Sequence, residues 1–168
     1  FLIVEPLPQS KVDGVTFWVN ESPVVALSLR YDRIDSFWHT FAHELIGHIG
    51  NGDGKRLEIL PDVDLLEQQN NADRPAYEIA ADTAAISFLV PQAELDNFIA
   101  RVGPLYSRDR IIGFANSIHV HPGIVVGQLQ HRGELAYSQY REMLVKVRDI
   151  VTDATLTDGW GHTLPPNA

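Results

Sequence analysis

The sequence predicts an α+β fold, in which a small N-terminal β-sheet is packed on a mainly helical remainder. Short apolar runs rich in β-branched residues lie within the first 29 positions. From Trp38 onward, apolar residues recur at helical spacing instead. The two patterns do not alternate along the chain, and strands followed by helices are typical of α+β domains rather than of parallel α/β sheets.

The composition fits one globular domain. The chain has 168 residues, of which 45% are hydrophobic and 21% charged. A chain of this length buries enough surface to fold without cross-links. It contains no cysteine, which excludes a disulfide framework and cysteine-ligated zinc. Twenty-two acidic against thirteen basic residues give a net charge of −9, which disfavours nucleic acids and anionic membranes as direct partners.

We expect a cytoplasmic protein that is part of a longer chain. No apolar run approaches the roughly 18 residues that a membrane span needs. The first residues also lack the basic flank of a signal peptide. Met143 is the only methionine, so the chain has no initiator residue. This predicts a C-terminal domain whose N-terminal neighbour is missing from the sequence.

The expected sheet has three strands. Residues 15–19 and 24–29 are short apolar runs, and the turn-forming tetrapeptide 20–23 separates them. Residues 2–4 form a further apolar run that Pro6 closes. The order of these runs predicts a small meander.

The helical part begins at Asp35 or Ser36, since either is a good N-cap. Glycines at 50–54 end this helix, and the polar, acidic stretch 55–71 is expected to be a surface loop. A second helix is expected from Asp73 to about residue 89. Four further helices are expected near Gln92–Val102, 107–118, Pro122–His131 and 138–151. Residues 156–168 are expected to form a loose tail.

The first expected helix carries an unusual group of polar residues on an apolar background. His43 and Glu44 begin the motif His-Glu-Leu-Ile-Gly-His, which ends at His48. Zinc hydrolases use His-Glu-x-x-His, where two imidazoles four positions apart share one helix face and the glutamate is the general base. Here the histidines are five apart, and on a regular helix their directions diverge by about 140°.

Two arrangements could still hold a metal ion. A one-residue π-bulge would return His43 and His48 to one face, and Gly47 would tolerate that distortion. Alternatively, His39 and His43 are already four apart, although position 40 is threonine and supplies no base. Both arrangements compete with a purely structural interpretation, in which buried histidines bond to backbone carbonyls or to nearby acids.

A second pair of acidic residues lies about thirty positions downstream. Glu78 and Asp82 are four apart on an otherwise apolar helix, where like charges repel unless a cation or an imidazolium lies between them. Catalytic zinc takes three protein ligands and keeps one position open. His43, His48 and Glu78 would make such a set, with Glu44 as the base and Asp82 orienting a histidine ligand. Alone, such an acidic pair is more often a solvated helix edge.

Taken together, these stretches resemble the ImmA/IrrE family of metallopeptidase domains. Within this family, the chain most resembles the domains that follow the helix-turn-helix in long HigA-like antitoxins and phage-type regulators. The matching stretches are 24–33, 37–49, 78–91 and 114–135. The resemblance implies a gluzincin-like metallopeptidase domain over residues 1–155, with its N-terminal helix-turn-helix absent from this sequence.

The resemblance also implies roles for single residues. His43 matches the first zinc ligand, Glu44 the general base and Glu78 the third ligand, while Asp82 lies where an orienting acid is expected. His48 matches the second ligand only if one residue between it and Glu44 is an insertion. The implied function is a zinc metallopeptidase-like domain of a bacterial or prophage toxin–antitoxin or stress regulator, which hydrolyses peptide bonds of a regulatory protein.

An alternative function is a catalytically inactive sensor, dimerisation or toxin-binding domain of an antitoxin-type regulator. The expected partners are accordingly a protein or peptide substrate or a cognate toxin, and a homodimer is compatible with both functions. DNA binding is expected only through the missing N-terminal domain. A weaker third option is direct DNA recognition by two helices of segment 108–131, with phosphate contacts from Arg108, Arg110 and Arg132.

Overall fold

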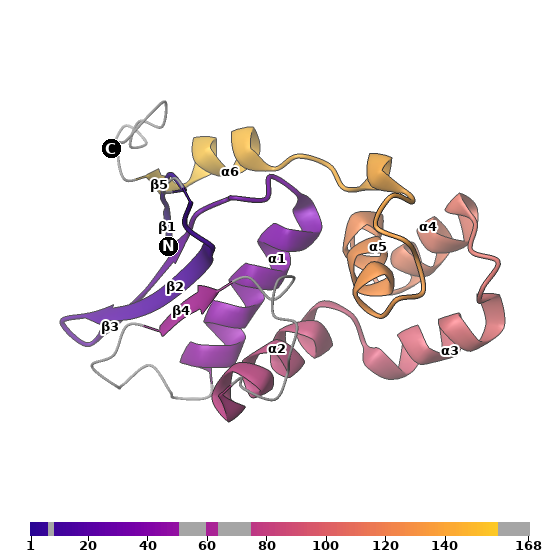
Figure 1. The fold of residues 1–168 in the computed structure, drawn as a ribbon, viewed down its shortest axis with the longest axis horizontal. Coiled ribbons are helices and arrows are strands. Elements are labelled where there is room, and N and C mark those ends of the chain that lie inside the picture. Colours follow the sequence, from indigo (N-terminus) through magenta and orange to yellow (C-terminus); the bar gives the residue numbers. More distant parts are fainter. Residues whose placement is uncertain (7–8, 51–59, 64–74, 158–168) are drawn as a thin grey trace.

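The computed structural model describes residues 1–6, 9–50, 60–63 and 75–157, and within these ranges the chain is an α+β fold, as predicted. Figure 1 shows the sheet on one side of the molecule, helices α3, α4 and α5 on the other, and α1 between them. Helix α6 lies beside the sheet again.

The elements have the following bounds. The strands are β1 (Leu2–Ile3), β2 (Val12–Val19), β3 (Ser22–Leu27), β4 (Leu60–Val63) and β5 (Leu156–Thr157). The α-helices are α1 (Ile34–Ala42), α2 (Ala76–Leu89), α3 (Gln92–Val102), α4 (Arg108–Ser117), α5 (Pro122–His131) and α6 (Arg148–Ala154). A π-helical segment, η1 (His43–Ile49), continues α1, and a 3₁₀ turn, η4 (Arg141–Met143), precedes α6.

The sheet is not the meander that the sequence predicts. Its strand order is β4-β2-β3-β1-β5, and only β2 and β3 form a hairpin, through Asn20 and Glu21 with positive φ. Strand β1 pairs in parallel with β3, with Ile3 opposite Leu27. Both of these side chains are fully buried against α1, so the hydrophobic core rather than a short turn determines where β1 pairs.

The expected loop 55–71 contains a strand, β4, which pairs antiparallel with β2. These four residues include Pro61 and show no alternation of apolar and polar residues, so the sequence does not predict a strand here. The strand forms because its backbone pairs with the edge of β2. The rest of this expected loop lies outside the described residues. So do the glycine-rich helix end at 51–54 and the expected helix start at Asp73.

Helix α1 separates two hydrophobic cores. One core lies between the sheet and α1 and includes Ile3, Leu27 and Phe37. The other is larger and is formed mainly by α2, α3, α4 and α5, with Leu95 and Leu129 among its fully buried residues. The segment η1 at the end of α1 contacts α2 on one side and strands β2 and β3 on the other. It therefore lies where the sheet, α1 and α2 meet.

Two predicted helix boundaries are wrong. Helix α1 begins at Ile34, before the expected caps, and the Asp35 carboxylate accepts hydrogen bonds from the Arg33 guanidinium instead of capping the helix. The helix expected over 138–151 is interrupted, because Tyr140 has a φ of 55° and only η4 and α6 form. The remaining helices agree with the predicted segments, α3 and α5 to the residue.

The C-terminal segment is held by Asp32, which precedes α1. One oxygen of its carboxylate, Oδ1, accepts hydrogen bonds from the backbone N–H groups of Val147 at 2.9 Å and Arg148 at 2.8 Å. This arrangement caps α6 and brings β5 to the edge of the sheet beside β1. The first two residues of the expected loose tail are therefore a strand, and residues 158–168 lie outside the described part. No described helix is long and apolar enough to cross a membrane.

Replacing Asp32 by alanine should lower the free energy of unfolding by about 2 kcal/mol, because two backbone donors lose a charged acceptor. Urea unfolding followed by circular dichroism measures this change. Asp153→Ala, at an exposed acid of α6, is the matched control and should have a small effect. Equal stability of the two variants would show that the cap does not hold the C-terminal segment.

Candidate metal centre

The segment η1 resolves the spacing problem of the two histidines. In a π-helix each N–H bonds to the carbonyl five residues earlier, and the N–H of Gly50 donates to the Leu45 carbonyl at 3.1 Å. Residues five apart therefore share one face. The Nε2 atoms of His43 and His48 lie 3.0 Å apart, and both side chains are fully buried. Of the two arrangements that the sequence allows, this is the one with the π-turn.

Helix α2 approaches η1 very closely at Gly47. A Cβ atom on Gly47 would lie 2.4 Å from the Cβ and 2.6 Å from the Cα of Ala81, which is itself fully buried. The two helices can therefore be this close only because one residue has no side chain and the other has a methyl group. Gly47 was expected to tolerate the π-turn, and the structure gives it a second role in helix packing.

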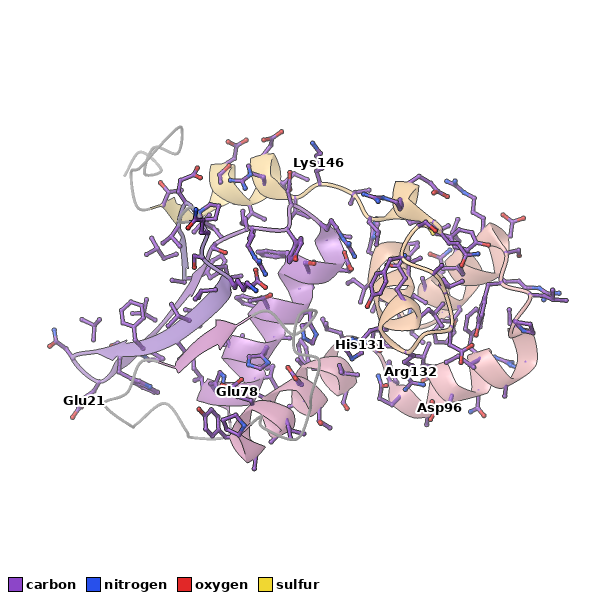
Figure 2. The ribbon with its side chains drawn as sticks, in the orientation of Figure 1. Glu21, Glu78, Asp96, His131, Arg132 and Lys146 are labelled. Atoms are coloured by element: carbon purple, nitrogen blue, oxygen red, sulfur yellow. The ribbon has the colours of Figure 1, made fainter. Side chains whose placement is uncertain are left out.

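This close approach brings Glu78 to the histidine pair. Glu78 is in the first turn of α2, and its Oε2 lies 3.1 Å from Nε2 of His43. Its Oε1 lies 3.8 Å from Nε2 of His48. The three residues each direct one donor atom into a common region, within 4.8 Å of one another. Figure 2 labels Glu78 on α2, where it faces the helix formed by α1 and η1.

Asp82 holds the opposite side of the His43 ring. Its Oδ1 lies 2.7 Å from Nδ1 of His43, and since an ionised carboxylate only accepts hydrogen bonds, this contact favours the tautomer with the proton on Nδ1. In that tautomer of the neutral ring, Nε2 carries a lone pair on the side of His48 and Glu78. A carboxylate behind an imidazole is the usual arrangement around a histidine that binds metal.

His39 lies on the Asp82 side of His43, with its Nε2 atom 3.8 Å from Asp82 Oδ1. It forms a second donor set with His43 and Asp82. His43 belongs to both sets, and its Nδ1 faces Asp82 while its Nε2 faces Glu78, so one ion cannot bind both sets through a single ring nitrogen. Burial among the helices lowers the pKa of His39 to about 4, and the charge of Asp82 offsets only part of this effect.

Glu44 is fully buried between η1 and the sheet. Its carboxylate accepts a hydrogen bond from the Thr16 hydroxyl of β2. A Cβ atom on Gly14 would lie 2.9 Å from Oε1 of Glu44, so the glycine leaves room for the carboxylate. The sequence analysis missed Thr16 and Gly14. A glycine and a threonine two positions apart, on one face of an otherwise apolar strand, are the signal that could have indicated them.

The three arginines of the segment considered for DNA recognition each contact another group of the protein. Helices α4 and α5 pack on each other. Arg108 pairs with Glu142 at 3.5 Å, and the Arg110 guanidinium donates to the Leu105 carbonyl at 3.3 Å. Arg132 donates to Asp96 and to Gln92. The three cations thus have protein partners, while the side chains of Arg108 and Arg110 remain at the surface.

No family model matches the chain, and neither the curated proteins nor the solved structures give a match. A functional interpretation therefore depends on the side chains that η1, α2 and β2 bring together.

Replacing Gly47 by alanine should lower the free energy of unfolding by about 1–3 kcal/mol, because the new methyl group overlaps Ala81 and must push α2 away. The matched control is Gly113→Ala in α4, where no atom lies within 4 Å of the added Cβ. That variant should gain about 0.5–1 kcal/mol, since alanine favours helix. Chemical unfolding of both variants measures the difference. A Gly47→Ala protein as stable as the native chain would contradict the close packing.

The lowered pKa of His39 predicts a loss of stability in mild acid. Between about pH 6.5 and about pH 4 the unfolded chain binds a proton at His39 that the folded chain does not. The free energy of unfolding therefore decreases as the pH is lowered through this range. In His39→Gln this part of the loss should disappear. Urea unfolding at pH 7 and pH 4.5 tests this, with His119→Asn at an exposed histidine as control. The same acid loss in native protein and His39→Gln would refute the assignment.

Proposed function

We propose that this chain is a zinc metallopeptidase-like domain of a bacterial or prophage toxin–antitoxin or stress regulator. In this proposal His43, His48 and Glu78 bind Zn²⁺, and the substrate is a peptide bond of a regulatory protein in the cytoplasm. The observation that carries it is the convergence of three donor atoms from η1 and α2, with separations of 3.0 and 3.1 Å from Nε2 of His43. The resemblance to the ImmA/IrrE family supports the same assignment.

The donor set fits zinc chemically. Two imidazole nitrogens and one carboxylate oxygen are a common ligand set of catalytic zinc, which leaves a fourth position open. With bonds of about 2.0–2.1 Å, ligand atoms of a tetrahedral ion lie about 3.3 Å apart. The two Nε2 atoms are 3.0 Å apart, and the Glu78 oxygens lie 3.1 Å from Nε2 of His43 and 3.8 Å from Nε2 of His48. These distances lie on both sides of the value for a tetrahedral ion. Two ring nitrogens this close also repel each other unless a proton or a cation lies between them.

The proposed reaction needs a base and a fixed ligand geometry, and Glu44 and Asp82 are the residues that would provide them. When bound, zinc supplies Lewis acidity, which acidifies a water molecule and polarises a substrate carbonyl. Glu44 would accept a proton from the attacking water and return it to the leaving amine, as the C–N bond breaks and the new C–O bond forms. Thr16 fixes the Glu44 carboxylate, and Asp82 fixes the ring of His43.

A second candidate function is a non-catalytic domain that senses, dimerises or binds a toxin. The hydrogen bond from Thr16 favours it, because it directs the Glu44 carboxylate toward β2. In both candidates, the partner is a protein or peptide, and DNA would be bound by a preceding domain. Glu44→Gln discriminates between them: it should abolish hydrolysis of a protein substrate at unchanged zinc affinity if the domain is catalytic, and should change neither property if it is not.

The gently purified chain should contain about one zinc ion per molecule, measured by elemental analysis. Asp82→Asn should weaken zinc binding 10- to 100-fold, because the ring of His43 loses its carboxylate partner. Glu78→Gln should weaken it at least as much. Glu94→Gln, also in the first turn of its helix, is the matched control and should bind zinc normally. A chain that neither contains zinc nor takes it up would refute the metal site.

Deleting Ile46 tests the π-turn directly. The deletion restores the usual spacing of four between the histidines, and on sequence grounds alone it should improve a zinc site. We expect the opposite, because η1 already places both Nε2 atoms together and the deletion rotates Gly47 relative to Ala81. The measurement is zinc affinity by competition with a chelator. Tighter binding after the deletion would show that the native π-turn does not hold the ion.

A further inference from the structure

A cavity of about 330 Å³ lies next to the candidate metal centre. Its walls come from α1, the end of α2, the start of α3 and α5, together with Asp13 of β2 and the segments before α1 and after α5. His131 and Arg132, labelled in Figure 2, belong to its wall at the end of α5. The volume is within the range of pockets that bind small ligands.

The cavity combines apolar walls with charges that are already neutralised. Ile86 and Leu89 of α2 and Ile124 of α5 supply its aliphatic walls. The charged lining groups each have a partner of opposite sign in the protein. These pairs are Asp13 with Arg30 at 2.8 Å, Arg33 with Asp35, and Arg132 with Asp96. Because the charges in these pairs neutralise each other, a charged ligand would find no unpaired opposite charge among them. The cavity therefore favours an uncharged, apolar group.

The cavity continues the helix face that carries the candidate centre. His39 and Thr40 line it, and they lie one helical turn before His43 and Glu44. A Cβ atom on Gly14 would touch both the Cγ2 atom of Thr40, at 2.7 Å, and the Oε1 atom of Glu44, at 2.9 Å. The cavity wall and the proposed base are therefore neighbours around one glycine of β2.

We propose that this cavity binds an aliphatic or aromatic side chain of the polypeptide substrate and so selects which peptide bond reaches the centre. This inference rests on the proposed function and names its substrate class. The side chain would contact Ile86, Leu89 and Ile124, and His131 and Tyr137 of the same lining would supply polar groups for the adjoining backbone amides. A lysine or glutamate side chain would be excluded, since its charge would lose water without gaining a partner.

The test is a titration of the metal-free chain with four probes, followed by ¹⁵N–¹H NMR spectra. N-acetyl-phenylalaninamide and N-acetyl-leucinamide should give saturable shifts confined to amides of α1, α2 and α5 around the cavity. N-acetyl-lysinamide and N-acetyl-glycinamide should bind at least tenfold more weakly. Ile86→Asp and Ile86→Trp, which charge or fill the cavity, should each weaken the apolar probes at least tenfold. Phe88→Asp, at a neighbouring side chain that is 59% exposed, should not.

The outcomes separate this inference from the metal site. Apolar probes that bind without zinc support the cavity assignment, even if zinc uptake later fails and the proposed function falls. Zinc uptake without selective binding of the apolar probes overturns the inference and leaves the metal site standing. Equal binding of the lysine and phenylalanine probes, or equal loss in Ile86→Trp and Phe88→Asp, also overturns it. The spectrum of each variant without probe shows whether the chain is folded.

Discussion

The contact between Gly47 and Ala81 is the constraint on which the candidate centre depends. Two helices with ordinary side chains at the contact pack 8–10 Å apart. Here one side chain is absent and the other is a methyl group, so the backbones of η1 and α2 come closer. Glu78 and Asp82, which flank Ala81 in the sequence, then reach opposite nitrogens of the same ring, that of His43. Without this approach the two helices would carry the same residues and form no cluster.

A π-turn is less stable than an α-turn, and tertiary contacts must compensate for it. In this chain several contacts act together on seven residues. Helix α2 packs on one side through Ala81, β2 holds Glu44 on another through Thr16, and Asp82 bonds to His43. The buried polar side chains of η1 thus contact two different elements, the histidines α2 and Glu44 β2. We infer that the sheet and α2 specify the local helix geometry jointly, so that neither could do so alone.

Much of this arrangement can be predicted from local pattern, and the rest cannot, for identifiable reasons. The helical spacing of apolar residues locates α3 and α5 to the residue, and the motif at 43–48 together with the acidic pair of α2 indicates the donor residues. The pairing of β1 with β3 and of β4 with β2 depends on long-range contacts that a period of two does not encode. The start of α6 likewise depends on the Asp32 carboxylate, which lies 115 positions before Val147 in the sequence. The choice between π-turn and α-turn depends on Ala81, which lies 34 positions from Gly47.

The seven-residue π-segment has a consequence for how such sites arise and are found. A helix that gains one residue normally turns every later side chain by about 100° and destroys any cluster built across the change. When the extra residue is absorbed within a single wide turn, the residues before and after it keep their partners. Lineages could therefore acquire or lose such a residue without losing the arrangement, and patterns with a fixed gap between histidines would overlook their members.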